Sequence, residues 1–450
     1  MDRRRFIRQG ALSAGALVIS GHSPFKQYPL KKPEVIVIGA GLAGLAAAYQ
    51  LKKEGCAVTV IESRSRIGGR VFSHRISNDL VIELGGEWVG NSHKRMQELC
   101  AAFGLELENN QMDTHLIYKN TYQKPGAWDY SDDWNKKFKK ILEAYPHLKE
   151  ADKRQLDRYD WWRFLVNNGC SGRDLDIREL LDSTDFGESI RHVSAFAALA
   201  EYAESSEKNE MDLKIKGGNA RLADKLREQI GAANIYCNHH VSKVVQKNSV
   251  EVMCSNGKRF SGDRLICAIP TFSVQKINWD PGLPAHLSAA INALQYARIN
   301  KHALHFKERF WKDEAFDLVS DQSPHYFYHA TKNQASAEGV LIAYSIGDKA
   351  ASNANQSDRF LANDVYRCLE SHFGNISSLL KGQANYYWGN DAYSYGAYAL
   401  YGIGQWFELM PELKKKFLHT YFAGEHLADW QGFMEGAINT GEAAADAVMG

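Results

Sequence analysis

A glycine-rich segment near residue 40 carries residue types whose spacing suits the binding of a nucleotide diphosphate. Gly39, Gly41 and Gly44 follow the apolar run 34–38, and Glu62 stands about 20 residues further along the chain. In such a segment the first glycine makes a tight turn, the second lets the backbone approach a pyrophosphate, and the third permits close helix–strand packing. The Glu62 carboxylate can accept hydrogen bonds from a ribose 2′-hydroxyl, which a 2′-phosphate would not permit. The spacing predicts a dinucleotide site.

A strand, a helix and a second strand must position this site. Residues 34–38 (EVIVI) and 57–61 (AVTVI) are short β-branched runs that suit buried parallel strands. An Ala- and Leu-rich segment ending at Lys53 lies between them and predicts a helix. The free N–H groups and the dipole at its start favour bound phosphates. The expected fold class is therefore α/β, with a Rossmann-like domain built on this βαβ unit.

The rest of the chain changes between helical and strand-like patterns. Large apolar residues recur at helical spacing within 130–215, amid Lys, Asp and Glu, which predicts a helical insertion with a polar outer face. An alanine-rich helix is expected at the C-terminus. The further strands predicted are 241–245, 250–254, 265–269, 300–306, 326–328, 341–346 and 420–422.

The composition excludes several classes of protein. The 450 residues are 44% hydrophobic and 24% charged, which excludes a disordered chain. A net charge of +1 gives no general attraction to polyanions, so nucleic acid is not an expected partner. No apolar run beyond residue 21 approaches the roughly 20 residues that a membrane helix needs. We expect a soluble protein.

The first 30 residues are interpreted as an export signal. Arg3 and Arg4 precede Phe6 and Ile7, and a short, weakly apolar stretch follows over 11–20. The arginine pair in this setting resembles the twin-arginine signal, and the alternative is the basic start of an amphipathic helix. The signal predicts a periplasmic or secreted protein that is not held at a membrane after export. Seven scattered cysteines, without a Cys-x-x-Cys pair, predict neither a disulfide framework nor a zinc site.

Further motifs recur in a fixed order over residues 34–448. They resemble the blocks of the flavin amine oxidase family, and they are 62–70 (ESRSRIGGR), 83–90 (ELGGEWVG), 215–219 (IKGGN), 422–426 (FAGEH) and 432–437 (GFMEGA). The resemblance implies an FAD-dependent amine oxidase, in which hydride passes from the α-carbon of an amine to flavin N5. The imine then hydrolyses to an aldehyde or ketone plus ammonia. Dioxygen would reoxidise the flavin and give hydrogen peroxide, or a periplasmic electron acceptor would take the electrons.

The resemblance implies a role for individual residues in holding FAD. Glu62 takes the adenosine ribose, and Val241 contacts the adenine through its backbone. Arg64 and Arg70 lie along the diphosphate, and Glu425 orders the diphosphate and ribityl region.

The same resemblance extends to the flavin ring. The helix that begins near Met434 directs its N-terminus at the pyrimidine ring and stabilises the reduced, anionic form. The flavin is expected to be non-covalent, because Ala397 stands where members with an attached flavin carry cysteine. The other cofactor-binding residues expected are Gly39, Gly41, Gly44, Gly69, Gly86, Glu87, Trp88, Trp388 and Gly424.

The substrate site is expected between two aromatic rings. Residues 388–398 resemble the family block whose last aromatic, here Tyr398, stands on the reacting face of the flavin. Phe433 is its partner, and it lacks the hydroxyl that a tyrosine would offer there. Two such rings would enclose an amine and exclude water. The alternative is that Tyr398 is an ordinary sheet aromatic, and we favour that interpretation for Tyr393 and Tyr395.

Lys301 is the third candidate catalytic residue. Family members carry a lysine at this place, hydrogen-bonded through water to flavin N5, and the alternative is a solvated lysine. Strand alternation puts Lys301 and His305 on one face and His302 on the other, which weakens a metal site formed by the two histidines. No metal is expected.

The blocks imply a discontinuous domain organisation and leave two alternative functions. An L-amino-acid oxidase of the same fold needs a cation for the substrate carboxylate, but no arginine follows the 83–90 loop until Arg95. A redox-silent FAD-binding scaffold would have no need of Lys301 and Tyr398. Which amine is oxidised and whether the chain forms a homodimer stay open. The domains expected are the signal over 1–30, the FAD-binding domain over 31–115, 212–282 and 384–450, and the substrate domain over 116–211 and 283–383.

Overall fold

The computed structural model describes residues 32–204, 212–429 and 431–450. The predicted export signal, residues 1–30, lies outside the described residues. Residues Pro33–Gly450 form one compact unit, to which all the elements below belong. Within the described ranges, no helix is both long and apolar enough to cross a membrane.

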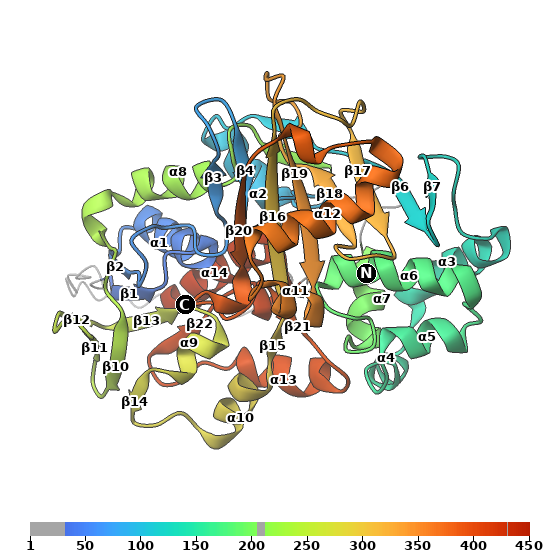
Figure 1. The fold of residues 1–450 in the computed structure, drawn as a ribbon. Coiled ribbons are helices and arrows are strands. Elements are labelled where there is room, and N and C mark those ends of the chain that lie inside the picture. The colour runs from blue at the N-terminus through green and yellow to red at the C-terminus, as the bar shows by residue number, and fades with distance from the viewer. Residues whose placement is uncertain (1–31, 205–211, 430) are drawn as a thin grey trace, which may run out of the picture. The chain divides into compact units, whose positions relative to one another are not determined.

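A five-stranded parallel sheet carries the glycine-rich turn (Figure 1). β1 (Glu34–Ile38) is its central strand, between β13 (Arg264–Cys267) and β2 (Ala57–Ile61). The outer strands are β22 (Thr420–Phe422) and β9 (Ile235–Tyr236). All residues of β1 except the first are buried, as expected for a parallel strand that is covered on both faces. The predicted βαβ unit is confirmed.

Helices cover one face of this sheet. α1 (Leu42–Lys53) packs against α14 (Met434–Met449) so closely that a Cβ on Gly441 would lie 2.1 Å from the Ala43 carbonyl oxygen. The layer is completed by α8 (Ala220–Ile230) and α2 (Lys94–Ala102). Because α14 packs tightly on α1, the C-terminal helix lies beside the helix that follows the glycine-rich turn.

The other face of the parallel sheet packs on a four-stranded sheet and three helices. The apolar contacts come from alternate residues of the strands, such as Ile36 and Ile38 of β1. These elements are β10 (Val241–Gln246), β11 (Val250–Cys254), β12 (Arg259–Gly262), β14 (Asn278–Asp280), α9 (Thr271–Gln275), α10 (Ala285–Ala293) and α13 (Gln405–Leu413).

A second sheet has seven strands in the order β20-β16-β19-β18-β17-β6-β7 and stands at the centre of Figure 1. Leu304 and Phe306 of its strand β16 pack toward α12 (Asp358–Phe373), whereas Ile299 and Ala303 belong to the apolar cluster on the opposite face. This alternation leaves the second face free to border the cavity described below. The strands are β6 (Asp113–Tyr118), β7 (Thr121–Gln123), β16 (Ile299–Phe306), β17 (Phe316–Ser320), β18 (Tyr326–His329), β19 (Gly339–Ile346) and β20 (Leu380–Tyr387).

The predicted helical insertion forms a layer at the right of Figure 1. Ser131 caps its first helix by accepting a hydrogen bond from the Trp134 backbone N–H, and Asp132 and Asp133 favour the same helix end. Trp161 is fully buried among the helices. The helices are α3 (Asp132–Ala144), α4 (Glu150–Leu156), α5 (Trp161–Asn167), α6 (Gly172–Phe186) and α7 (Ala195–Glu204).

The predicted fold class, α/β with a mixed sheet and helices beside the nucleotide-binding unit, is confirmed. β6 begins before residue 116 and β20 spans residues 383 and 384, so the second sheet extends into segments assigned to the FAD-binding domain. The domain boundaries themselves stay predictions. The remaining elements are β3 (Ser73–Arg75), β4 (Val81–Glu83), β5 (Leu107–Asn109), β8 (Leu213–Ile215), β15 (Gln295–Tyr296), β21 (Ala399–Leu400) and α11 (Gly347–Asn353).

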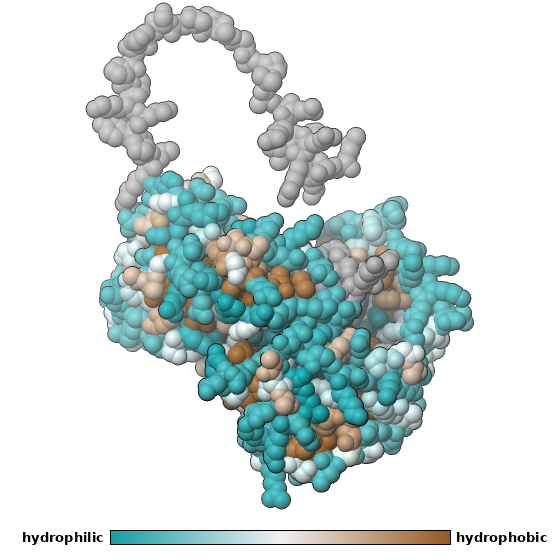
Figure 2. Space-filling view, turned by 90° about the horizontal axis from the view of Figure 1, so that it is seen from above, coloured by the Kyte–Doolittle hydropathy of each residue, from teal (hydrophilic) through white to brown (hydrophobic). Residues whose placement is uncertain are grey.

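The surface in Figure 2 is mainly hydrophilic, and hydrophilic residues separate the hydrophobic ones. The large hydrophobic residues that are exposed come from separate elements and are scattered singly, which is usual for a protein surface.

Candidate active site

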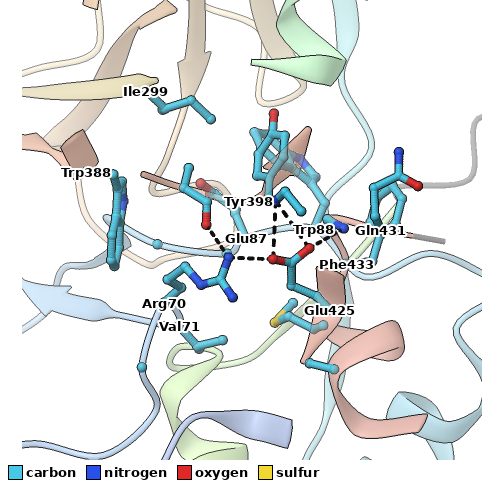
Figure 3. Close-up of a pocket in the computed structure, with 18 of the residues that line it drawn as sticks. Arg70, Val71, Glu87, Trp88, Ile299, Trp388, Tyr398, Glu425, Gln431 and Phe433 are labelled. Atoms are coloured by element: carbon cyan, nitrogen blue, oxygen red, sulfur yellow. Dashed lines mark hydrogen bonds and ion pairs between the residues drawn. The ribbon is translucent and has the colours of Figure 1, made fainter. Parts of the chain in front are cut away.

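A cavity of about 620 Å³ runs from the glycine-rich turn to the space between the second sheet and the helical layer (Figure 3). Its walls come from segments far apart in the sequence, including the 62–70 run, the 83–90 loop, β16 and the start of α14. Most of the residues expected to bind cofactor or substrate line this cavity. Val241 and Gly44 are not among the lining residues.

At Gly39 and Gly44 the glycine turn leaves room only for backbone. Gly39 has φ +101°, and a Cβ there would lie 2.8 Å from the carbonyl oxygen of Ala268. A Cβ on Gly44 would lie 1.9 Å from the Gly39 carbonyl oxygen, so Gly44 is required for packing of helix on strand. A Cβ on Gly41 would meet only the Gly69 backbone, at 3.9 Å, so space remains there for a ligand to approach the chain.

Glu62 is fixed by the turn that it faces. Its two carboxylate oxygens accept one backbone N–H each, from Ala40 and from Arg64, both at 2.8 Å. The side chain is buried and lines the cavity. A carboxylate can accept about four hydrogen bonds, so acceptor sites remain for a ribose hydroxyl. Val241 lies in β10, and its predicted adenine contact stays a prediction.

The two arginines of the 62–70 run are held by ion pairs. Arg64 pairs with Asp391 and donates to the Ser394 hydroxyl at 2.8 Å. Arg70 donates to Glu425 at 2.6 Å and to the Ala397 carbonyl oxygen at 2.7 Å (Figure 3). Both guanidinium groups border the cavity, where a diphosphate would find positive charge of fixed geometry.

Glu425 joins the cofactor side of the cavity to the substrate side. Besides Arg70, its carboxylate accepts the backbone N–H of Ala399 at 3.2 Å and that of Gly432 at 2.7 Å. These two residues adjoin Tyr398 and Phe433 in the sequence. Glu425 thus fixes the segments that carry both expected aromatic walls.

The 83–90 loop passes along the cavity in a fixed conformation. A Cβ on Gly85 would lie 2.1 Å from the Arg70 carbonyl oxygen, so the two segments touch through their backbones. Trp388 donates its indole N–H to the Leu84 carbonyl oxygen at 2.8 Å. Gly86 faces Met434 at the start of α14, and Met434 and Ala437 of the first turn of this helix line the cavity, so the helix N-terminus with its unpaired N–H groups borders the site. The site thus combines close-packed glycines, arginines held in place by ion pairs and a helix N-terminus. This combination suits the binding of a flavin dinucleotide.

Tyr398 and Phe433 both line the cavity, and Figure 3 shows them on different segments. The Tyr398 hydroxyl donates to the Asp185 carbonyl oxygen at 2.7 Å, which holds the ring in place. Phe433 immediately precedes α14, and its ring packs against His93, with 5.2 Å between ring centroids. Tyr393 and Tyr395 lie outside the cavity lining, so the structure brings only Tyr398 of the three to the site.

Lys301 is buried, with 4% of its surface exposed, which excludes the alternative of a solvated lysine. Its ammonium donates to the carbonyl oxygens of Glu83 (3.1 Å) and Gly85 (2.9 Å) and to the Glu87 carboxylate (3.2 Å). Burial lowers the pKa of Lys301, and the neighbouring Glu87 opposes that shift. All three N–H donors have protein acceptors, so a bridging water would have to share one of them.

Three acidic residues line the cavity that the sequence did not single out. Asp185 lies near the C-terminal end of α6, Glu201 lies in α7 and Asp317 lies in β17. Burial raises the pKa of both Asp185 and Asp317 to about 7, and neighbouring Asp182 adds to the effect at Asp185. Burial and repulsion from Asp185 also raise the pKa of Glu201. Nothing in their local sequence distinguishes these acids from surface acids.

The arginines and the lysine that line the cavity already form ion pairs with protein carboxylates. The basic residues among the described lining are Arg64, Arg70, Lys301 and the buried His426, and the first three each pair with a carboxylate. Arg95, the first arginine after the 83–90 loop, is outside that lining and forms a forked ion pair with Glu442 at 2.8–3.0 Å.

His302 and His305 have different partners. His302 contacts Gln383 at 3.0 Å, and His305 contacts Glu338 at 2.7 Å. Across the described residues, no group of three possible metal-binding side chains is present. All seven cysteines are free thiols, and none is part of the described cavity lining.

The fold and the site define a flavin-dependent oxidoreductase, because a dinucleotide cradle opens directly into a shielded aromatic cavity. The chain belongs to the family of flavin-containing amine oxidoreductases, whose family model matches residues 42–449.

Individual relatives cover nearly the whole chain. A probable flavin-containing monoamine oxidase A of Dictyostelium discoideum is 23% identical over 91% of this chain and 95% of its own. The L-amino acid oxidase bordonein-L of Crotalus durissus terrificus is 26% identical over 91% of this chain and 86% of its own. A solved putrescine oxidase bound to putrescine superposes with a TM-score of 0.84 and 21% identity, covering 93% of this chain and 99% of its own. The last similarity is one of fold.

Proposed function

We propose that this enzyme is an FAD-dependent amine oxidase that binds its substrate between Tyr398 and Phe433. The observation that carries the proposal is that the nucleotide cradle continues into a cavity bounded by these two rings and by acidic side chains. Bound FAD would supply the acceptor for the hydride that leaves the α-carbon of the amine. Amine oxidation also fits the relatives named monoamine oxidase and polyamine oxidase.

The chain's own residues orient the amine and control its proton. The rings of Tyr398 and Phe433 position the α-carbon and exclude water from it. The carboxylates of Asp185 and Glu201 attract a cationic amine into the cavity. Hydride leaves only from the neutral amine, and Asp185, with a pKa of about 7, is able to accept the proton near neutral pH.

The acidic side chains of Asp185 and Glu201 at the cavity wall favour amines over amino acids as the proposed substrates. The carboxylate of an amino acid would lie close to Asp185 and Glu201 without a free cation among the described lining residues. A second amino group on the substrate would instead be attracted. We therefore propose a preference for diamines or polyamines, and the putrescine bound by the solved neighbour is consistent with it.

The handling of electrons and the location of the enzyme are further parts of this proposal. Ala397 at the place of an anchoring cysteine supports non-covalent FAD. We propose that dioxygen reoxidises the flavin and yields hydrogen peroxide, with a periplasmic electron acceptor as the alternative. The Arg3–Arg4 segment supports export by the twin-arginine route, and replacing both arginines by lysine in the full chain should leave the enzyme in the cytoplasmic fraction.

The experiment that tests the function is an anaerobic screen. The full-length yellow protein is mixed with monoamines, diamines, polyamines and L-amino acids, and bleaching of the flavin band is recorded. We expect bleaching by amines, with diamines acting at lower concentration than monoamines of equal length. Glu201→Gln should remove that advantage while sparing monoamine oxidation. Bleaching by amino acids alone would overturn the assignment, and a flavin that no compound bleaches would favour the scaffold alternative.

A further inference from the structure

A buried carboxylate at the cavity wall is shared by two lysines. Glu87 accepts hydrogen bonds from Lys301 at 3.2 Å on one oxygen and from Lys214 at 3.3 Å on the other. The Tyr328 hydroxyl donates to the same oxygen as Lys301, at 2.5 Å. Lys214 comes from β8 and also donates to the Ala330 carbonyl oxygen at 3.0 Å. Three separate segments thus meet at one carboxylate.

Water compensates little of the charge in this group. The exposed fractions are 2% for Glu87, 4% for Lys301 and 7% for Lys214. Buried charges interact more strongly than exposed ones and persist only when they are paired and hydrogen-bonded. A single pair of Lys301 with Glu87 would be electrically neutral, so the second ammonium leaves one net positive charge.

The two lysines differ in their position relative to the cavity. Lys301 and Glu87 line the cavity, whereas Lys214 is not among the lining residues. Lys301 lies 5.5 Å from the ring centre of Trp88, which also lines the cavity, and 5.6 Å from that of the buried Tyr328. Lys214 therefore does not reach the cavity, where substrate and cofactor would bind. It can influence the site only through its contact with Glu87.

Two further titratable groups interact with this cluster. Burial lowers the pKa of His329 to about 4, so this imidazole is neutral at neutral pH. The other group is Glu83. Its carboxylate accepts from the Ser73 hydroxyl at 2.8 Å and from the Asn219 backbone N–H at 2.8 Å. Burial raises the pKa of Glu83 to about 7, so at neutral pH it neutralises the cluster only in part. The charge balance of Lys214, Glu87 and Lys301 is therefore the main control on the potential at this wall.

We propose that Lys214 is a positioning residue that offsets Glu87, so that Lys301 presents a net positive charge to the flavin ring. This inference rests on the proposed function, since it requires a flavin beside Lys301. It predicts that the affinity of the flavin region for an anion depends on Lys214, although Lys214 is outside the cavity wall.

The test uses sulfite, an anion that adds reversibly to oxidised flavins and bleaches them. Sulfite Kd is measured by titration of the flavin-loaded enzyme for Lys214→Met, Glu87→Gln and the double variant. Lys214→Met should weaken sulfite binding at least tenfold, about 1.4 kcal/mol. Glu87→Gln should tighten it, and the double variant should return to within about threefold of the wild type, because one charge of each sign has been removed.

The control is Lys216→Met, which removes an exposed lysine two residues away that pairs with Glu106 at 3.0 Å, and it should leave sulfite Kd unchanged. Unchanged sulfite binding in Lys214→Met would overturn the inference. So would a double variant that binds sulfite more weakly than Lys214→Met, because that result indicates lost packing rather than charge balance. If Lys214→Met does not fold, tighter sulfite binding by Glu87→Gln remains the deciding measurement. A colourless wild-type protein would instead refute the proposed function.

Discussion

Replacing Lys301 by Met tests the central group of the site for both stability and catalysis. The change keeps approximate side-chain length but removes the charge and all three N–H donors. It removes one hydrogen-bond donor from each of two buried carbonyl oxygens and one donor from an oxygen of Glu87. Breaking a buried ion pair from one side costs about 3–5 kcal/mol. Glu87 keeps Lys214 and Tyr328 as partners, so we expect the lower end, about 3 kcal/mol.

For a chain of this length, 1 kcal/mol corresponds to on the order of 1 °C in Tm, so Lys301→Met should lower Tm by about 3 °C. FAD content should stay near normal, because the cradle residues are unchanged. Flavin reduction or reoxidation, followed by stopped-flow absorbance, should slow at least about tenfold, or 1.4 kcal/mol. Adding Glu87→Gln should lower the stability further, since it leaves the buried Lys214 ammonium without its carboxylate.

Lys307→Met is the matched control, because Lys307 directly follows β16, is exposed, and donates its ammonium to the Ser378 carbonyl oxygen rather than to a buried carboxylate. Its stability should stay within about 0.5 kcal/mol of the wild type. Lys301→Met with an unchanged Tm, and with both half-reactions altered less than twofold, would refute the reasoning.

Four further outcomes are expected. Glu62→Ala should lose most of the bound FAD and with it the yellow colour, and retention of FAD would show that the ribose contact is wrong. Acid precipitation should release the flavin into the supernatant, whereas a yellow washed pellet would indicate covalent attachment. Tyr398→Ala and Phe433→Ala should each raise KM and lower kcat with FAD content near normal; normal turnover in both would exclude the aromatic cage. Because the pKa of Asp185 is raised to about 7, the carboxylate loses its charge below that pH, so kcat/KM should fall as pH drops through 7, and Asp185→Asn should flatten this limb of the profile.

The nucleotide-binding unit could be predicted from the sequence because its information is local. The β-branched run 34–38, the three glycines and Glu62 lie within one short stretch, and each element follows from its own residues. Alternation along 300–306 also placed Lys301 correctly on the face opposite His302, since side chains of a strand alternate whatever its neighbours are. Predicted strand ends were accurate to within about two residues, and β16 begins one residue earlier than expected.

The environment of those residues depends on contacts between distant segments. Nothing near Lys301 in the sequence indicates that Glu87 and Lys214 meet it, and nothing near Asp185 indicates that it faces Tyr398. Burial then changes the chemistry, because a carboxylate or ammonium removed from water shifts its pKa and requires a partner.

The sequence by itself therefore determined the βαβ unit, the kind of ligand and the residue types available for amine chemistry. Only the tertiary structure decided which charges are shielded, which are shared and which face the cavity. The physical reason is that periodicity and turn chemistry act between neighbours in the chain, whereas electrostatics depends on distance and solvent exclusion, which the folded arrangement alone sets.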